Sequence, residues 1–281
     1  KLGGKGMQKI DMIINARHIY TLQGEGVGYL ENNSLAIDKG KIVAIEPIDE
    51  IKKEYTAEKT IDAEDKLVMP GLIDGHMHTT WCTLRGLAQD VGNWMMHGAG
   101  PFTTKSTDKS MIAGAKLGIA EAILNGTTTI GDDGNLAEEV YKYGVRGNVS
   151  VRIREALEKV YEPGALYEYS EDKGNQTLEK TLRVYDKWHN KDDRIKVLFG
   201  PQGADFVSKE MLEKVKRLSK ERNTKISMHL SQGSRETKQM EMRYASRTIP
   251  WLARKNYFDE DFIGIHLTDA LPDEVKAVVD N

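Results

Sequence analysis

The sequence predicts an α/β fold in which a layer of short strands precedes a parallel sheet or barrel built from strand–helix units. Three observations lead to this prediction. The chain has 281 residues, enough for two ordinary domains. Its N-terminal part alternates short apolar stretches with glycine-containing turns. From Pro70 onward, short apolar strands alternate instead with amphipathic helices.

The N-terminal region, residues 7–69, has the pattern of a small β domain. Short alternating stretches at Met12–Asn15, Ser34–Asp38 and Lys41–Ile45 are separated by glycines. This pattern is typical of antiparallel strands, so we expect a small antiparallel layer here.

The second region, residues 70–281, repeats the strand–helix pattern of a parallel sheet or barrel. Its clearest helix is 208–220, where Ser208 is suited to cap the N-terminus and the apolar residues share one face. About six units are visible, so an eight-unit barrel would need roughly 70 more residues, and we expect the barrel to be incomplete at its C-terminus. The expected strands are Val68–Gly75, Thr127–Gly131, Gly147–Ile153, Ile195–Gly200, Lys225–Leu230 and Phe262–Leu267.

Composition excludes several classes of protein. Forty Lys and Arg against 43 Asp and Glu give a net charge of -3, which offers no basic surface for nucleic acid or a membrane. No apolar run approaches the ~18 residues of a membrane helix. A single cysteine, Cys82, cannot form an internal disulfide, so a cytoplasmic location is expected. No GxGxxG motif follows a strand, which argues against a dinucleotide-dependent oxidoreductase.

The strongest local signal is the segment PGLIDGHMH at 70–78, where an apolar strand ends in His-x-His. Side chains two residues apart lie on the same side of a strand, so His76 and His78 can reach one cation at ~2.0 to 2.1 Å. Taken alone, the pair is equally consistent with two histidines in structural or solvent-facing positions.

Two further histidines, His229 and His266, end later strands in the same way. In a parallel β/α barrel the carboxyl ends of the strands converge on one mouth, where active sites lie. Independent structural histidines would rarely all fall at strand ends. The four therefore predict one shared site.

The chain resembles the amidohydrolase superfamily, in particular the branch of cytosine, guanine and methylthioadenosine deaminases and triazine (atrazine) hydrolases. The resemblance covers residues 12–281. It implies a metal-dependent hydrolase with a distorted (β/α)8 TIM-type barrel and a small β-sandwich assembled from both chain ends. The matching motifs are KIVAI at 41–45, PGLIDGHMH at 70–78, LRG at 84–86, GTTT at 126–129 and MHL at 228–230.

The resemblance implies that His76, His78 and His229 are metal ligands and that His266 is a catalytic residue beside the metal-bound water or the substrate. The family's remaining ligand is an Asp after the eighth strand, which would lie beyond Asn281. Such a ligand set leaves one position for a water whose pKa Zn²⁺ can lower to roughly 7.

One divalent ion is expected, Zn²⁺ first and Fe²⁺ as the alternative, because neutral N and O ligands suit both metals. The binuclear branch of the superfamily uses a carboxylated lysine at the end of the fourth strand. In this chain the lysine of that strand, Lys196, stands near its beginning. The resemblance therefore implies a mononuclear site.

Two departures from the family pattern concern the substrate. Deaminases of this branch usually carry a Glu three residues after the fifth-strand histidine, where this chain has Gln232; an amide binds a substrate but does no acid–base work. Nucleoside-type relatives place a histidine after Gly-Pro, where this chain has Gln202. Both changes favour a neutral substrate edge, such as an amide, an amidine or a halogenated heteroaromatic carbon.

The long segment after the first barrel strand is expected to cover the mouth. Trp94 and His97 on this segment are candidates for contacts with a flat substrate ring, with ordinary loop packing as the alternative. One of Asp132 and Asp133, at the end of the second strand, is a candidate hydrogen-bond partner of a ligand histidine, because adjacent strand residues do not both face inward.

These observations predict a hydrolase of the amidohydrolase or deaminase type, in which a metal-activated water cleaves a C–N (or C–halogen) bond of a small heterocyclic or amidine-like substrate. The alternative is a non-catalytic or inactive scaffold that lacks the Asp ligand. The expected partners are a small-molecule substrate and, by analogy with similar families, a second copy in a homodimer, with no nucleic acid or membrane.

Overall fold

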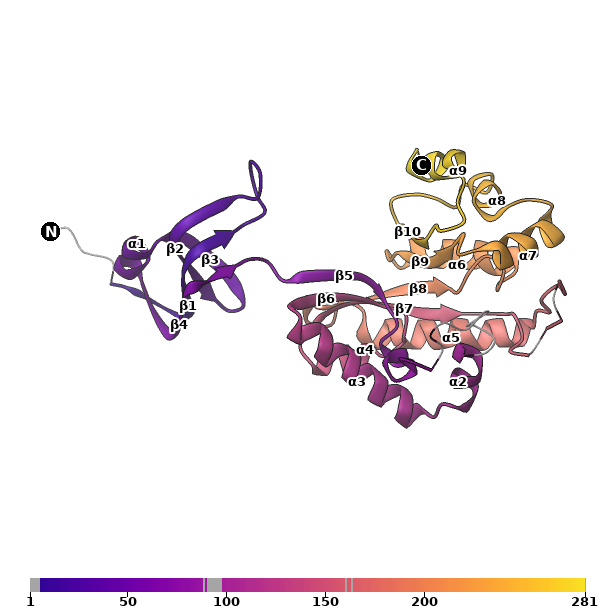
Figure 1. The fold of residues 1–281 in the computed structure, drawn as a ribbon, viewed down its shortest axis with the longest axis horizontal. Coiled ribbons are helices and arrows are strands. Elements are labelled where there is room, and N and C mark those ends of the chain that lie inside the picture. The colour runs from indigo at the N-terminus through magenta and orange to yellow at the C-terminus, as the bar shows by residue number, and fades with distance from the viewer. Residues whose placement is uncertain (1–5, 88, 90–97, 160, 163, 281) are drawn as a thin grey trace. The chain divides into compact units, whose positions relative to one another are not determined.

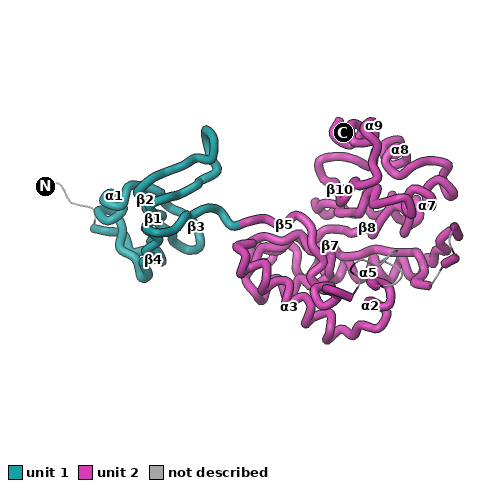
Figure 2. The backbone as a smooth tube through the Cα atoms, viewed as in Figure 1, with its two compact units in different colours: residues 1–71 teal, residues 72–281 magenta. Residues whose placement is uncertain are grey.

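The computed structural model describes residues 6–87, 89, 98–159, 161–162 and 164–280. It divides into two compact units, residues 1–71 and 72–281 (Figure 2). Among the described residues, no helix is long and apolar enough to cross a membrane.

The first unit contains a sheet with the strand order β3-β2-β1-β4, together with one short helix (Figure 1). Ile10, Ile13, Ala36 and Ile51 form part of its buried core. The bounds are β1 Gln8–Tyr20, β2 Tyr29–Asp38, β3 Lys41–Pro47, α1 Ile48–Glu54 and β4 Tyr55–Val68.

The expected antiparallel layer is correct for β1, β2 and β3 but wrong for the sheet as a whole, because β4 pairs in parallel with β1. Helix α1 crosses over between β3 and β4, and parallel neighbours need such a crossover. The sequence prediction missed β4 because Glu, Asp and Lys recur along it, and most of its residues are exposed.

The second unit is built on a parallel sheet with the strand order β10-β9-β8-β7-β6-β5. It confirms the predicted α/β fold of strand–helix units. All six expected strands are present, and the first begins later than expected, at Leu72, because β4 extends to Val68. The bounds are β5 Leu72–Met77, β6 Thr127–Asp132, β7 Arg146–Ile153, β8 Ile195–Pro201, β9 Ile226–Leu230 and β10 Phe262–His266.

Helices follow the strands and cover the outer face of this sheet (Figure 1). Ser208 caps α6 as expected, because its side chain accepts a hydrogen bond from the backbone N–H of Met211. The bounds are η1 Thr79–Leu84, α2 Gly100–Lys105, α3 Asp108–Leu124, α4 Ala137–Lys142, α5 Glu171–Trp188, η3 Lys191–Asp193, α6 Lys209–Glu221, α7 Ser234–Tyr244, α8 Thr248–Ala253 and α9 Pro272–Val279.

The main core lies between the sheet and the helices. Alternate residues of the central strands face the helices, as Val149 and Val151 do on β7 and Val197 and Phe199 do on β8, all 1% exposed or less. Because side chains alternate along a strand, the residues between them face the other side of the sheet. His229 and the histidine cluster lie on that side of the sheet.

Candidate metal centre

The strand pattern explains why His229 faces the inside of the curled sheet. Ile226, Met228 and Leu230 of β9 are fully buried and belong to the core shared with the helices. The residue between the last two must face the opposite side of the sheet. His229 therefore faces inward, as the sequence predicts.

The other histidines come from the two edge strands. His76 lies on β5, and His78 follows the last residue of that strand, at the start of η1. His266 ends β10 with a φ of 83°, and Leu267 follows with a φ of 56°. Such left-handed backbone is rare for residues other than glycine and concentrates at functional sites.

The structure brings all four histidines into one cluster. The Nε2 atoms of His76 and His78 are 3.2 Å apart. The ring centroid of His229 lies 5.1 Å from that of His76 and 5.5 Å from that of His78. The ring of His266 lies 5.5 Å from His76 and 5.2 Å from His229.

A carboxylate that the sequence analysis did not assign as a ligand completes this cluster. Asp133, immediately after β6, places Oδ2 3.5 Å from His78 Nδ1 and 3.8 Å from His229 Nε2. The same oxygen accepts a hydrogen bond from Arg152 of β7 at 2.7 Å. Its neighbour Asp132 instead accepts hydrogen bonds from the backbone N–H and the hydroxyl of Thr79, at 3.0 and 2.8 Å.

A backbone contact fixes the orientation of His229. Its Nδ1 lies 2.9 Å from the carbonyl oxygen of Gln202, which can only accept. Nδ1 therefore carries the proton, and Nε2 is left with its lone pair directed into the cluster. Such a contact from the distal ring nitrogen is the usual way in which proteins orient a metal-binding imidazole.

Burial keeps these imidazoles neutral. It lowers the pKa of His78 and of His229 to about 4. Burial also lowers the pKa values of His76 and His266. Burial raises the pKa of Asp133, but the charge of Arg152 and the neighbouring histidines outweigh this effect, so the net pKa is lowered. Near neutral pH the cluster thus offers neutral nitrogens and one carboxylate, the forms that bind divalent metals.

The residues expected to bind substrate have different surroundings in the structure. The side chain of Gln202 accepts a hydrogen bond from Arg154 at 2.9 Å. Gln232 follows the turn after β9, where its backbone N–H donates to Glu236 and its carbonyl accepts from Thr268. Trp94 and His97 lie outside the described residues.

Sequence reasoning missed Glu236, a 1% exposed carboxylate at the start of α7. It accepts hydrogen bonds from the backbone N–H groups of Ser231 and Gln232, both at 2.9 Å, and from the hydroxyl of Thr248 at 2.6 Å. The clue in the sequence is that Glu236 stands four residues after Gln232. The first turn of α7 therefore lies beside the turn that follows β9.

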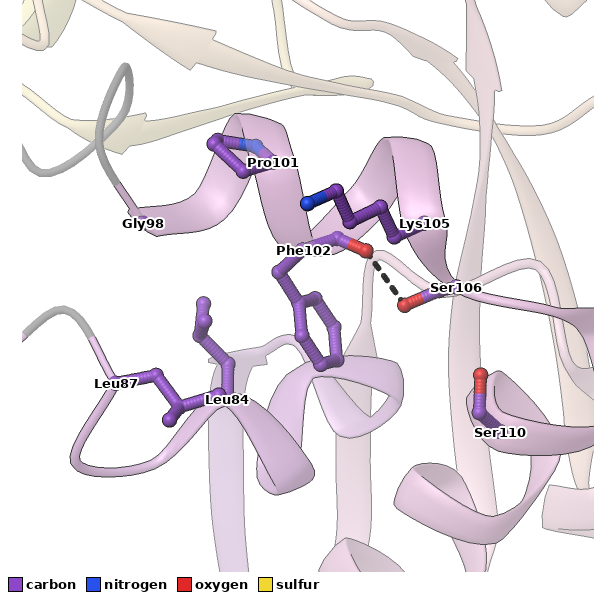
Figure 3. Close-up of a pocket in the computed structure, with 8 residues that line it drawn as sticks. All are labelled: Leu84, Leu87, Gly98, Pro101, Phe102, Lys105, Ser106 and Ser110. Carbon is purple, nitrogen blue, oxygen red and sulfur yellow. Dashed lines mark hydrogen bonds between the residues drawn. The ribbon is translucent and has the colours of Figure 1, made fainter.

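An aromatic ring and an apolar pocket lie on the segment that follows β5. Trp81 of η1 stacks on His78, with ring centroids 4.9 Å apart. A pocket nearby is lined by residues that include Leu84, Leu87 and Phe102 (Figure 3). None of the described residues that line this pocket is one of the four histidines, so it is distinct from the cluster.

Comparison with known proteins defines the class. Residues 67–269 match the amidohydrolase family, and the chain belongs to that family. This finding confirms the resemblance stated from the sequence motifs.

Particular relatives share part of their length with this chain. It is 28% identical over 274 residues to a 5'-deoxyadenosine deaminase from Methanococcoides burtonii, a match that covers 96% of this chain and 60% of the relative. It is 30% identical over 240 residues to a 5-methylthioadenosine/S-adenosylhomocysteine deaminase from Thermoanaerobacter pseudethanolicus, covering 84% of this chain and 53% of the relative. The chain thus spans a little over half the length of these relatives.

Solved structures share the fold. A zinc-bound adenosine deaminase from Xanthomonas campestris superimposes with a TM-score of 0.85 at 21% identity, covering 98% of this chain and 62% of that one. A zinc complex of atrazine chlorohydrolase from Arthrobacter aurescens superimposes with a TM-score of 0.77 at 16% identity, covering 96% and 63%.

Proposed function

We propose that the second unit of this chain is barrel structure of a hydrolase that requires a divalent ion and cleaves a C–N bond of a small heterocyclic or amidine-like molecule. The observation that carries the proposal is the clustering of four imidazoles at the carboxyl ends of β5, β9 and β10. Among the described residues, two overlapping groups could hold an ion, one of His76, His229 and His266 and the other of His78, Asp133 and His229. Membership of the amidohydrolase family supports it.

The donor geometry fits a small divalent ion. Two ligands bound at ~2.0 to 2.1 Å in a tetrahedral arrangement lie about 3.3 Å from each other. The Nε2 atoms of His76 and His78 are 3.2 Å apart, which is close to that separation. Neutral nitrogens and carboxylate oxygens suit Zn²⁺ and Fe²⁺ alike. We favour a single Zn²⁺, with Fe²⁺ as the alternative.

His76, His78 and His229 would hold the ion. Zn²⁺ bound there would supply Lewis acidity, which lowers the pKa of a coordinated water to roughly 7. His266 is exposed and stacks beside His229 at an angle of 29°. We assign it the role of polarising the substrate or orienting the attacking water through a hydrogen bond. Gln232 would orient the substrate through its amide.

The names of the relatives guide the choice of substrate. The two curated relatives deaminate 5'-deoxyadenosine and 5-methylthioadenosine or S-adenosylhomocysteine, according to their names. We propose an amino-substituted heteroaromatic ring for this chain. A halogenated ring is the second candidate, because Gln232 and Gln202 replace titratable residues and a C–halogen bond needs no protonated leaving group.

The experiment is a substrate panel tested on the metal-free, Zn²⁺-loaded and Fe²⁺-loaded chain. It would contain 5'-deoxyadenosine, 5-methylthioadenosine, guanine and atrazine, with ammonia and chloride release measured separately. We expect metal-dependent ammonia release, and we expect His229→Gln to abolish it. An absence of ammonia and chloride release from a chain that binds Zn²⁺ would refute the proposed activity.

Gln232 gives a sharper test of the substrate-binding arrangement. Gln232→Glu introduces an acid–base group, so we expect the pH profile of turnover to gain a new ionisation. Gln232→Met serves as the control, since it removes the amide without adding charge. An unchanged pH profile in the Glu variant would show that position 232 does not contact the reacting group.

We propose further that the protein acts in the cytoplasm as a homodimer on a small molecule and binds neither nucleic acid nor a membrane. The single cysteine supports the location, and the net charge of -3 supports the absence of nucleic-acid and membrane partners. The dimer is proposed by analogy with similar families. Sedimentation analysis of the purified chain tests the dimer.

A further inference from the structure

Asp133 is held at the histidine cluster by its backbone. Its N–H donates to the carbonyl of Met77, the residue between His76 and His78, at 3.0 Å. Its neighbour Asp132 pairs with Met77 in the β5–β6 ladder. Asp133 is 7% exposed. The sheet therefore delivers a buried carboxylate beside the His-x-His segment, and no loop movement is needed to bring it there.

The distance from Asp133 to His229 is closer to that of two ligands that share an ion than to that of a hydrogen bond. Asp133 Oδ2 lies 3.8 Å from His229 Nε2. A charge-assisted hydrogen bond would bring such atoms to about 2.7–2.9 Å, whereas tetrahedral ligands at ~2.0 to 2.1 Å from an ion lie about 3.3 Å apart. The same oxygen lies 3.5 Å from His78 Nδ1, the ring nitrogen other than the Nε2 that faces His76. One ligand atom from each of the three residues lies within 4.8 Å of the others.

The contact of His229 with the backbone directs one ring nitrogen towards Asp133. Its Nδ1 lies 2.9 Å from the carbonyl oxygen of Gln202, which can only accept, and its Nε2 lies 3.8 Å from Asp133 Oδ2. That separation is too long for a hydrogen bond between the two atoms. A divalent ion bound by both atoms fits this spacing.

Arg152 does not by itself account for the arrangement. It donates one hydrogen bond to Asp133 Oδ2 at 2.7 Å, which orients the carboxylate. A carboxylate offers about four acceptor positions, so this bond leaves room for an ion. Asp132 provides the contrast, because its carboxylate bonds to Thr79 and belongs to neither of the histidine groups that could hold a metal.

We propose that the Asp133 carboxylate binds the divalent ion directly, beside His229 Nε2, as a ligand that this chain supplies from the end of β6. The proposal rests on the metal dependence proposed above and adds a ligand that the family pattern did not assign.

Metal binding by the full 281-residue chain tests it. Zn²⁺ affinity and the visible absorption of the Co²⁺ form would be measured for the wild-type chain, Asp133→Asn and Asp205→Asn. Asp205 is the matched control, a buried aspartate that pairs with Arg235 and belongs to neither of the histidine groups that could hold a metal. Circular dichroism checks folding.

Asp133→Asn should weaken Zn²⁺ binding more than the ~10–100-fold typical of groups that only orient a ligand, and it should change the Co²⁺ spectrum. Asp205→Asn should do neither. A weaker affinity with an unchanged Co²⁺ spectrum would overturn the proposal, since it would make Asp133 a positioning residue.

A second variant tests the proposal by the appearance of a new absorption band rather than by a loss of metal affinity. In Asp133→Cys a thiolate takes the carboxylate's place, and a thiolate bound to Co²⁺ produces an intense sulfur-to-metal charge-transfer band in the near ultraviolet. The wild-type chain, which already contains Cys82, supplies the baseline. If the folded Cys variant binds Co²⁺ without this band, Asp133 is not a ligand.

The two proposals fail in different ways. A wild-type chain that binds neither Zn²⁺ nor Co²⁺ contradicts the proposed metal-dependent function, and the Asp133 assignment with it. A wild-type chain that binds both ions, with an Asp133→Asn variant that matches it in affinity and spectrum, contradicts the Asp133 assignment alone.

Discussion

His76 and His266 lie on the two edge strands of the six-stranded sheet, yet their ring centroids are only 5.5 Å apart. In a flat sheet, six strands spaced at about 4.8 Å would hold the edge strands about 24 Å from each other. The sheet must therefore curl until its edges approach at their carboxyl ends. The cluster exists because of this curvature, and an ion bound there would link β5 to β9 and β10.

Zn²⁺ should accordingly stabilise the folded chain. At a free Zn²⁺ concentration of 100 times Kd, the free energy of unfolding should rise by about 2.7 kcal/mol. Urea denaturation with Zn²⁺ and with a chelator measures the difference. His229→Ala should lose the effect, while His18→Ala, in the first unit, should keep it. An unchanged urea midpoint on adding Zn²⁺ to the wild-type chain would contradict this prediction.

The metal-free chain should lose stability as the pH falls. Burial lowers the folded-state pKa of His78 and of His229 from 6.5 to about 4. Between these values the unfolded chain binds more protons, so the stabilisation is complete above pH 6.5 and declines as the pH falls towards 4. The loss should be on the order of 2 to 3 kcal/mol for each histidine.

Urea denaturation at pH 7.5, 6.0 and 4.5 in the presence of a chelator measures this loss. The double variant His78→Gln/His229→Gln serves as the control, because carboxylates elsewhere also titrate in acid. The wild-type chain should show the steeper dependence on pH. Equal slopes would mean that the two imidazoles are not desolvated in solution.

Glu236 should be important for the turn that follows His229. Glu236→Ala leaves buried donors without an acceptor, each costing about 1–3 kcal/mol, so we expect a loss of about 3 kcal/mol or more. Glu236→Gln keeps one acceptor oxygen and should cost less. The exposed Glu241 of the same helix gives the control, and Glu241→Ala should change the free energy of unfolding by less than about 0.5 kcal/mol. Thermal and urea denaturation would test this order.

Gln202→Ala should leave the Zn²⁺ affinity essentially unchanged. The contact to His229 comes from the backbone carbonyl of residue 202, which every substitution retains. The side chain bonds to Arg154 instead, so its removal should raise KM if it contacts substrate. Isothermal titration with Zn²⁺ and steady-state kinetics separate the two effects. A large loss of Zn²⁺ affinity would show that the amide, rather than the carbonyl, supports the site.

The sequence predicted the parallel unit well because its strands carry a signal at two levels. Met228 and Leu230 mark the core face of β9, and His229 between them marks the inner face, so one local pattern locates both the strand and the site. The β4 strand had no such contrast, because its charged residues are mostly exposed on a small sheet.

Asp133 shows what a linear pattern cannot resolve. The sequence places Asp132 and Asp133 together at a strand end, and only the three-dimensional ladder shows which carboxylate faces Thr79 and which faces the histidines. The contact of the Gln202 carbonyl with His229 could not be predicted either, since every residue type has the same backbone carbonyl. Position 232 was recognised from the family pattern, but the contacts of its backbone to Glu236 depend on the fold.

The tautomer of His229 is set by a main-chain atom rather than by a side chain. A point mutation at position 202 therefore changes the side chain at this strand end while the imidazole keeps its proton on the same nitrogen. Sequence change at this position is thus separated from the orientation of the imidazole.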